Sequence, residues 1–413
     1  MLPVELRPHI YWVGVNDRTT QLFEGLWSIQ EEGISYNSYL IDDEKKAIID
    51  LSSKMTTDEL VAQIRTVMDP AQLDYIVINH MEPDHSGALK ALLLLAPQVV
   101  LLGTAKTQQM LERFYGITEN VHVVSDGERL CLGEHSLRFV ATPFVHWPET
   151  MMTYEESQHI LFSCDGFGGY GALNGRIFDD DIQPLDWYEA QSLRYFVNII
   201  ATFSKPVRNA IAKLEGLPLD IVAPSHGLVW RKRPQHIIDL YRRWAAYATG
   251  PGDLSVTLIY ASMYGNTEKM MEVIAQGILD QDVPLTVFNV ATTPLSHILP
   301  ALWTGHGVMV GAPTYEGGLF PPMAKTLEMA EIKHIYNKLA ARFGSHAWNG
   351  GAQRRFEQMA ETLKWQLTGN FEFSGAPSQD ELLRGRQFGS ELACQVRLAL
   401  QNRGEIPRSV PLN

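Results

Sequence analysis

A cluster of glycine, proline and aspartate interrupts the chain at positions 248–253, where the sequence reads Ala-Thr-Gly-Pro-Gly-Asp. A helical pattern precedes the cluster around Ile237–Tyr247, and an apolar run typical of a strand follows it at Ser255–Ala261. Such residues favour linkers because glycine loosens and proline restricts the backbone. The length of 413 residues corresponds to two or three domains of about 150 residues each. The sequence therefore predicts a domain boundary here, between residues 1–250 and 251–413.

The two sides of this boundary differ in pattern. Before it, short strands at Ile10–Val13, Ser38–Ile41 and Lys46–Asp50 give way to alternating strands and helices. This mixture predicts two sheets covered by helices. After it, helices alternate with four strands, expected at 255–261, 284–289, 307–311 and 340–344. That alternation, closed by a helix at Gln379–Gln401, predicts a parallel doubly wound α/β sheet.

Charge and cysteine content exclude several classes of function. Lys and Arg number 34 against 47 Asp and Glu, a formal net charge of −13, which argues against a nucleic-acid or anionic-membrane partner. The three cysteines (131, 164 and 394) are too far apart for a CxxC pair, so they form no rubredoxin centre or disulfide scaffold. The N-terminus does not read as a secretory signal, and no apolar run reaches the roughly 18 residues of a membrane span. We therefore expect a cytoplasmic protein.

Four of the expected strands end in residues that bind metals. The strand at Tyr75–Ile78 runs into an H-x-E-x-D-H motif at positions 80–85, where Pro83 argues against a regular helix. Three further strand ends lead to His146, Asp165 and His226. Ligand sites in α/β sheets collect beyond the carboxyl ends of strands. We therefore expect these four loops to converge, although each histidine alone would more simply cap a helix or fill a polar loop.

The four loops together supply seven nitrogen and oxygen donors: His80, Glu82, Asp84, His85, His146, Asp165 and His226. Seven donors are too many for a closed tetrahedral zinc site. They suit two metals of higher coordination number that share one carboxylate. Imidazole with carboxylate accommodates iron, although donor type alone leaves manganese and zinc open.

Three loops of the second half are typical of a flavin site. The first, before a helix expected from Glu268, offers backbone N–H groups and hydroxyls to a phosphate; its candidates are Ser262, Met263, Tyr264, Gly265, Asn266 and Thr267. The other two follow the third and fourth strands, with candidates Pro313, Thr314, Tyr315, Gly317, Gly318, Ser345, Ala347, Trp348, Asn349, Gly350 and Gly351. Each places an aromatic residue among small ones, which suits a flat isoalloxazine ring. The three loops resemble those of flavodoxins, and FMN is the expected cofactor.

One glycine-rich segment fits a nucleotide motif but lacks its context. Residues Gly166–Gly171 read G-x-G-x-x-G after a strand, yet the following residues do not form an amphipathic helix. We expect a flexible stretch beside Asp165 rather than a dinucleotide site.

The metal motifs resemble those of the metallo-β-lactamase-fold domain of flavodiiron proteins, and the resemblance extends over nearly the whole chain. It implies an αββα sandwich followed by a flavodoxin-like domain, with FMN and two iron ions per chain. Zinc hydrolases of this fold usually carry histidine where Glu82 stands, and the exchange favours a redox-active iron pair. The positions implied for one iron are His80, Glu82 and His146, and those for the other are Asp84, His85 and His226, with Asp165 bridging. In some relatives the position of His85 is turned away from the metal.

The resemblance also implies an activity. Such proteins are oxidoreductases that reduce dioxygen to water, nitric oxide to nitrous oxide, or both, with electrons passing through FMN from an external rubredoxin-type donor. They are head-to-tail homodimers. Two alternatives remain open from the residues: a dinuclear zinc hydrolase fused to a flavodoxin-like module, and a diiron gas-binding or sensor protein without turnover. The ligand set serves both gases, so it does not indicate a preference.

Overall fold

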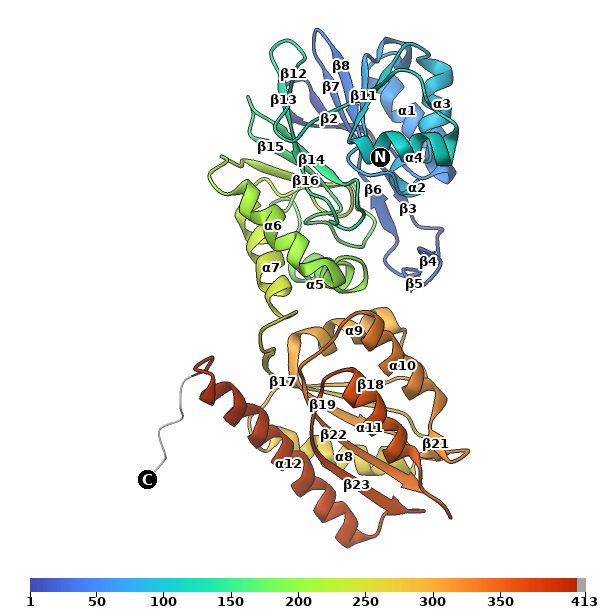
Figure 1. Ribbon diagram of the computed structural model, residues 1–413, viewed down its shortest axis with the longest axis vertical. Coiled ribbons are helices and arrows are strands. Elements are labelled where there is room, and N and C mark those ends of the chain that lie inside the picture. The colour runs from blue at the N-terminus through green and yellow to red at the C-terminus, as the bar shows by residue number, and fades with distance from the viewer. Residues whose placement is uncertain (407–413) are drawn as a thin grey trace. The chain divides into compact units, whose positions relative to one another are not determined.

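The computed structural model describes residues 1–406 of the chain. By its internal contacts the chain divides into two compact units, Met1–Ala245 and Ala246–Asn413. Both units appear in Figure 1. Every helix among residues 1–406 is too short or too polar to cross a lipid bilayer.

Two sheets lie at the centre of the first unit (Figure 1). The larger has the strand order β1-β2-β7-β8-β9-β10-β11, with bounds Val4–Arg7, Ile10–Trp12, Tyr39–Asp42, Lys46–Ile49, Tyr75–Val77, Val100–Gly103 and Val121–Val123. The smaller has the order β12-β13-β14-β15-β16, with bounds Arg129–Cys131, Ser136–Ala141, Met151–Glu155, Ile160–Cys164 and Ile221–Pro224. Strands β8 to β11 pair in parallel, as do β15 and β16, so their carboxyl ends point the same way within each sheet.

Helices cover these two sheets. Helices α1, α3 and α4 lie together beside the larger sheet, and α5, α6 and α7 beside the smaller (Figure 1). Their bounds are Thr57–Val67, Leu89–Leu95, Ala105–Tyr115, Asp186–Tyr195, Ser204–Leu214 and Pro234–Ala246. Every residue of β14 and β15 is buried, as expected of a sheet covered on both faces. The predicted αββα sandwich is confirmed.

Two small antiparallel sheets of two strands each, β3 with β6 and β4 with β5, complete the unit; their bounds are Val15–Asp17, Ile34–Tyr36, Leu22–Phe23 and Trp27–Ser28. Local sequence sets the helix ends. Before α4, the hydroxyl of Thr104 accepts the Thr107 N–H at 3.3 Å, and Gly116 ends the helix with a φ of 70°. These are ordinary cap positions for threonine and glycine.

Two sequence expectations for the first unit are wrong. A short helix, α2, spans Pro83–Ser86 within the metal motif. Pro83 permits it because proline at the first helical position loses no helical hydrogen bond. The segment Gly166–Gly171 is buried rather than flexible: Tyr241 donates its hydroxyl to the Gly168 carbonyl at 2.9 Å, and a Cβ at Gly169 would lie 2.5 Å from Ser192 Oγ. Its glycines serve close packing.

The second unit is built on one parallel sheet (Figure 1). Its strand order is β18-β17-β19-β22-β23, with bounds Leu285–Asn289, Asp253–Tyr260, Gly305–Gly311, Leu339–His346 and Gln366–Ser374. All four strand pairs are parallel. The order turns around at β17, where the chain first moves to β18 and then crosses to β19. In doubly wound sheets such a switch point is where ligands bind.

Helices cover both faces of this sheet. Helices α8 and α12 lie on one face, and α9, α10 and α11 on the other (Figure 1). Their bounds are Asn266–Leu279, Gln379–Asn402, Leu295–Thr304, Pro321–Ile332 and Ala352–Thr362. A short hairpin joins β20 and β21, Thr314–Tyr315 and Gly318–Leu319. Helices α8 and α12 touch closely because a Cβ at Gly389 would lie 2.2 Å from the Ile274 carbonyl oxygen. The predicted flavodoxin-like doubly wound sheet is confirmed.

A buried histidine should make the second unit sensitive to acid. His306 is 2% exposed, and burial together with the nearby Lys338 and Arg403 lowers its pKa to about 4. The unfolded chain takes up the proton near pH 6.5, so stability falls as pH drops from about 6.5 to about 4. Between pH 7 and pH 5 the loss should be about 2 kcal/mol at about 1.4 kcal/mol per pKa unit.

The comparison of wild type with His306→Gln isolates this contribution. Urea unfolding of the full chain, followed by circular dichroism at both pH values, should show a smaller acid loss in the variant. An equal acid loss in both proteins would contradict the prediction.

Candidate functional site

The structure brings all seven predicted metal-binding residues together in the first unit. Asp84 and His85 lie in helix α2, and the other five lie in the loops that follow β9, β13, β15 and β16. Their ligand atoms form two main groups, each within 4.8 Å: His80 with Glu82, His146 and Asp165, and Asp84 with His85 and His226. Asp165 also forms a group with His85 and Cys164, so it belongs to both sides of the cluster.

The carboxylate of Asp165 lies between the two groups. Its Oδ2 lies 3.4 Å from His80 Nε2 and 3.3 Å from His146 Nε2. Its Oδ1 lies 3.0 Å from His85 Nε2 and 3.4 Å from His226 Nε2. One oxygen therefore faces each group, which is the arrangement that a bridging carboxylate requires.

The other two carboxylates each serve one group. Glu82 Oε2 lies 3.3 Å from His80 Nε2 and 3.1 Å from His146 Nε2. In the second group, Asp84 Oδ1 lies 3.4 Å from His85 Nε2 and Oδ2 lies 3.3 Å from His226 Nε2. Each group thus has two histidines and its own carboxylate beside the shared one.

Several of these buried atoms lack a hydrogen-bond partner within residues 1–406. They are both carboxylate oxygens of Asp84 and Asp165 and the Nε2 atoms of His85 and His226. Leaving buried polar atoms unpaired is costly, and one cation in each group would satisfy them. Four imidazoles and three carboxylates of this kind fit a pair of iron ions.

The electrostatics of the cluster are dominated by its carboxylates. Burial alone would lower the pKa of each histidine, but the adjoining carboxylates outweigh it. They raise the pKa of His80 and His226 to about 10 and that of His85 and His146 to about 9. Burial would raise the pKa of Glu82, yet its bonds to His146 and His80 lower it to about 2. A metal ion that binds here displaces protons from the histidines.

Groups behind the cluster fix the orientation of two histidines. His80 Nδ1 lies 2.7 Å from Glu149 Oε1, which also accepts the Met81 N–H at 3.0 Å. His226 Nδ1 lies 2.7 Å from the Ser35 carbonyl oxygen. With Nδ1 carrying the proton, each ring presents Nε2 to the cluster.

A buried aspartate ties two of the ligand loops together. Asp50 Oδ1 accepts the backbone N–H of Asn79 at 2.8 Å, and Oδ2 accepts its side-chain amide at 3.0 Å. Ser225 donates its hydroxyl to Oδ2 at 3.3 Å. Asn79 and Ser225 immediately precede His80 and His226. Sequence reasoning assigned no role to Asp50 or Glu149, and the available signal was an acidic residue beside a strand end or a ligand loop.

Loss of the Glu149 charge should weaken metal binding without dismantling the site. Glu149→Gln leaves His80 Nδ1 without its charged acceptor, and such partners typically contribute about 10–100-fold in metal affinity. We expect a drop of that size in iron affinity, measured by competition with a chelator. Glu156→Gln is the control, because Glu156 pairs with the exposed Arg129. Equal affinities in the two variants would show that Glu149 does not orient His80.

A cavity opens beside the cluster in the first unit. Its volume is about 320 Å³, and among its lining residues are Phe23, Tyr36, Lys54, Glu82 and Asp84. A diatomic molecule fits easily in this space. The cavity therefore gives a small ligand access to one edge of the cluster.

The first flavin candidate loop forms a cradle at the start of α8. Gly265 has a φ of 88°, and its N–H donates to Ser262 Oγ at 3.0 Å. The helix begins at Asn266, two residues before the expected position, so Asn266 and Thr267 lie in its first turn. N–H groups at a helix start, with the Ser262 and Thr267 hydroxyls, suit a phosphate.

The three candidate loops meet at the carboxyl ends of β17, β19 and β22. Thr267 Oγ1 lies 3.1 Å from Ser345 Oγ. A Cβ at Gly351 would lie 2.1 Å from the Gly317 carbonyl oxygen. Ser345 belongs to the end of β22, which runs two residues beyond the expected strand, so the first loop contacts the end of β22 and the third loop contacts the second.

The chemistry of these loops fits a flavin. Within residues 1–406, Thr314 Oγ1 and His346 Nδ1 are buried without a hydrogen-bond partner. Tyr264 and Trp348 are 91% and 94% exposed, so their rings are free to stack. The remaining candidates lie in the same loops: Met263, Pro313, Tyr315, Gly318, Ala347, Asn349 and Gly350.

Comparisons with known proteins cover both units. A family described as ODP family beta lactamase matches residues 34–227, and flavodoxin matches residues 258–389. The chain is 36% identical over 404 residues to the anaerobic nitric oxide reductase flavorubredoxin of Escherichia coli K12, covering 96% of this chain and 83% of that protein.

Comparison with solved structures points to the same family. The chain is similar to the rubredoxin oxygen:oxidoreductase of Desulfovibrio gigas, with a TM-score of 0.90, 26% identity and coverage of 96% and 99% of the two chains. It is also similar to a flavo di-iron protein variant from Thermotoga maritima, with a TM-score of 0.86, 30% identity and coverage of 96% and 100%. These matches confirm the resemblance, and the chain belongs to the flavodiiron protein family.

Proposed function

We propose that the protein is a flavodiiron oxidoreductase that reduces dioxygen to water, nitric oxide to nitrous oxide, or both. The observation that carries the proposal is the Asp165 carboxylate, with one oxygen toward each of two buried groups of histidine and carboxylate. A site for a single catalytic metal would not need two groups of histidine and carboxylate ligands. The names of the relatives include both nitric oxide and oxygen as substrates, so both gases remain in the proposal.

The proposed ligands divide as the two groups do. His80, Glu82 and His146 would hold one iron and Asp84, His85 and His226 the other, with Asp165 shared. His85 belongs in this set because its ring is buried and its Nε2 points at Asp165.

The side chains around the two ligand groups would hold the metals and balance their charge. When bound, the iron pair and FMN supply the electrons, four for dioxygen or two for a pair of nitric oxide molecules. Three carboxylates in the cluster offset the charge of two metal cations, and Glu82 adds an anionic ligand where a histidine would be neutral. Glu149 and Ser35 hold the Nδ1 protons of His80 and His226 away from the metals. The buried strands behind the ligand loops exclude bulk water.

Electrons would come from a rubredoxin-type donor through FMN. The name of the Desulfovibrio gigas relative pairs rubredoxin with oxygen, and this supports the same kind of donor here. The three flavin candidate loops, residues 262–267, 313–318 and 345–351, would bind FMN. We further propose a head-to-tail homodimer in the cytoplasm, in which the flavin of one subunit serves the metal centre of the other; family membership supports the dimer.

One experiment tests the function and separates the alternatives. Protein with measured metal and flavin content is reduced anaerobically and then given dioxygen or nitric oxide with reduced rubredoxin. Two irons and one FMN per chain, with steady gas consumption, would support the proposal. Two zinc ions with thioesterase activity and no gas consumption would identify a hydrolase. A stable gas adduct that persists beside reduced donor would identify a sensor.

A further inference from the structure

A fully buried arginine lies in the sheet of the second unit. Arg342, in the middle of β22, is 0% exposed, and its neighbours in sequence, Ala341 and Phe343, are buried apolar residues. A buried guanidinium stays charged and is costly unless it is paired and hydrogen-bonded. An apolar side chain would be the simpler occupant of this position, so the arginine calls for an explanation.

Its partners come from both neighbouring strands. Nη1 donates to Asn370 Oδ1 at 2.9 Å and to Glu372 Oε1 at 2.8 Å on β23. Nη2 donates to the carbonyl oxygen of Ala312, just after β19, at 3.2 Å. Nε is buried without a hydrogen-bond partner among residues 1–406. The side chain thus joins three adjacent strands near their carboxyl ends.

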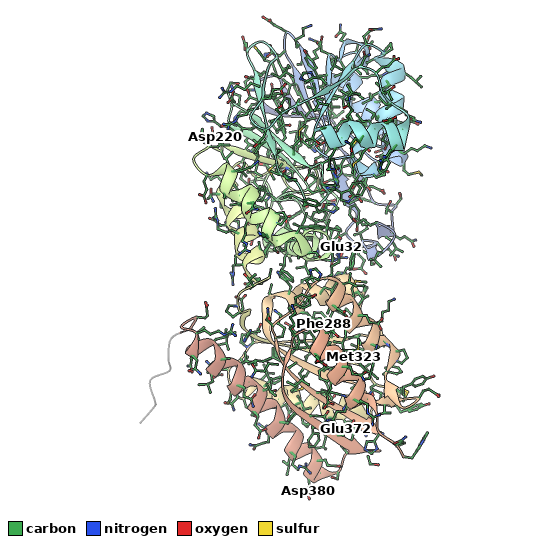
Figure 2. The ribbon with its side chains drawn as sticks, in the orientation of Figure 1. Glu32, Asp220, Phe288, Met323, Glu372 and Asp380 are labelled. Carbon is green, nitrogen blue, oxygen red and sulfur yellow. The ribbon has the colours of Figure 1, made fainter. Side chains whose placement is uncertain are left out.

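These contacts lie directly beneath the two loops proposed to flank the flavin ring. Ala312 immediately precedes the loop 313–318, and Gly344 immediately precedes the loop 345–351. A Cβ at Gly344 would lie 2.0 Å from the Ala312 carbonyl oxygen and 2.7 Å from Arg342 Nη2. Glu372, labelled in Figure 2, comes within 3.6 Å of a Cβ built at Gly350. The ion pair therefore underlies both loops.

We propose that Arg342 is a positioning residue for FMN that also raises the flavin's midpoint potential. Its fork of donors holds the starts of the two loops together, and its charge lies against Ala312 and Gly344, the residues that precede the loops proposed to flank the ring. Reduction adds negative charge to the ring, which a fixed cation in a region of low dielectric favours. Glu372 offsets part of this charge, but its side chain is 23% exposed, so solvent screens it more than the buried guanidinium. The inference rests on the proposed FMN site.

A purely structural role makes a different prediction. Replacing a buried ion pair by apolar groups is often neutral or stabilising. If Arg342 had only a structural role, its replacement would leave the midpoint potential of bound FMN unchanged. The midpoint potential therefore distinguishes the two roles, and unfolding measurements alone do not.

Spectroelectrochemical titration of the full-length, FMN-loaded chain tests the inference. Arg342→Met should lower the equilibrium constant for FMN reduction about tenfold, about 30 mV for a two-electron couple. Arg342→Lys should keep the potential but weaken FMN binding about tenfold, because lysine lacks the planar fork. Glu372→Gln should shift the potential upward. Arg386→Met is the control, because it removes the same charge from an exposed pair with Asp280.

Each outcome decides between the two roles. Arg342→Met with bound FMN and an unchanged potential would overturn the inference while leaving the FMN site intact. If that variant does not fold, Arg342→Lys decides: an FMN affinity about tenfold lower than that of wild type supports the inference, and an unchanged FMN affinity overturns it. A wild-type chain that takes up no FMN would overturn the proposed function and this inference with it.

Discussion

Asp165→Asn should abolish gas reduction while FMN remains bound. The substitution removes the charge shared by the two ligand groups and replaces one oxygen by an amide, which donates hydrogen bonds and binds cations poorly. Four buried histidines then face two carboxylates instead of three. We expect iron to fall from two to less than one ion per chain and turnover of either gas to fall at least ~100-fold, since changes in supporting residues alone cost about 10–100-fold.

Iron analysis, flavin absorbance and gas electrodes measure these quantities on one sample. Asp220→Asn is the matched control, because Asp220, labelled in Figure 2, is an exposed aspartate of the same unit. It pairs with His159 at 3.2 Å. The variant should retain full iron content and turnover. An Asp165→Asn protein with two irons and wild-type turnover would mean that the bridge assignment is wrong.

Gly351→Ala should produce the opposite pattern, with FMN lost and iron retained. Gly351 has a φ of 144°, and a Cβ there would lie 2.1 Å from the carbonyl oxygen of Gly317. Alanine therefore meets both an unfavourable backbone conformation and a backbone atom that cannot move aside without opening the second and third loops. Backbone strain of this kind costs of order 1–3 kcal/mol, and we expect FMN affinity to fall at least ~10-fold.

Fluorescence titration of the apoprotein with FMN measures this affinity. Gly404→Ala separates strain from contact, because Gly404 also has a positive φ, 75°, but a Cβ there would have no neighbouring atom within 4 Å among residues 1–406. That variant should bind FMN as wild type does. Unchanged FMN affinity in Gly351→Ala would show that the contact between these two loops does not shape the flavin site.

The candidate metal ligands can be predicted from the sequence because they follow the ends of strands. His80, His146, Asp165 and His226 each follow a strand that its apolar run reveals, and the carboxyl ends of such strands face a common edge. The flavin loops can be predicted for the same reason. Helix α2 was not predicted from the sequence, because proline usually breaks a helix. Pro83 occupies the first helical position, where proline is tolerated.

The residues that support the metal ligands and the flavin loops cannot be predicted from the sequence in this way. Glu149 reaches His80 across 69 positions of the chain, and Asp50 reaches Ser225 across 175. No periodicity links such pairs, because their contact depends on how two sheets pack. Arg342 is hidden for a related reason: its strand reads as a buried apolar run, and only the register with β19 and β23 supplies its partners.

Residue type and spacing were enough to predict the two kinds of fold, the candidate donors for the metals and the candidate loops for the flavin. These follow from residue type and spacing along single elements, where local geometry decides which side chains share an end. The positions of Asp165 between both ligand groups, of Glu149 and Asp50 behind the ligand loops, and of Arg342 beside the candidate flavin loops become visible only in the folded chain. Those features depend on distances between segments far apart in the chain, which packing alone sets.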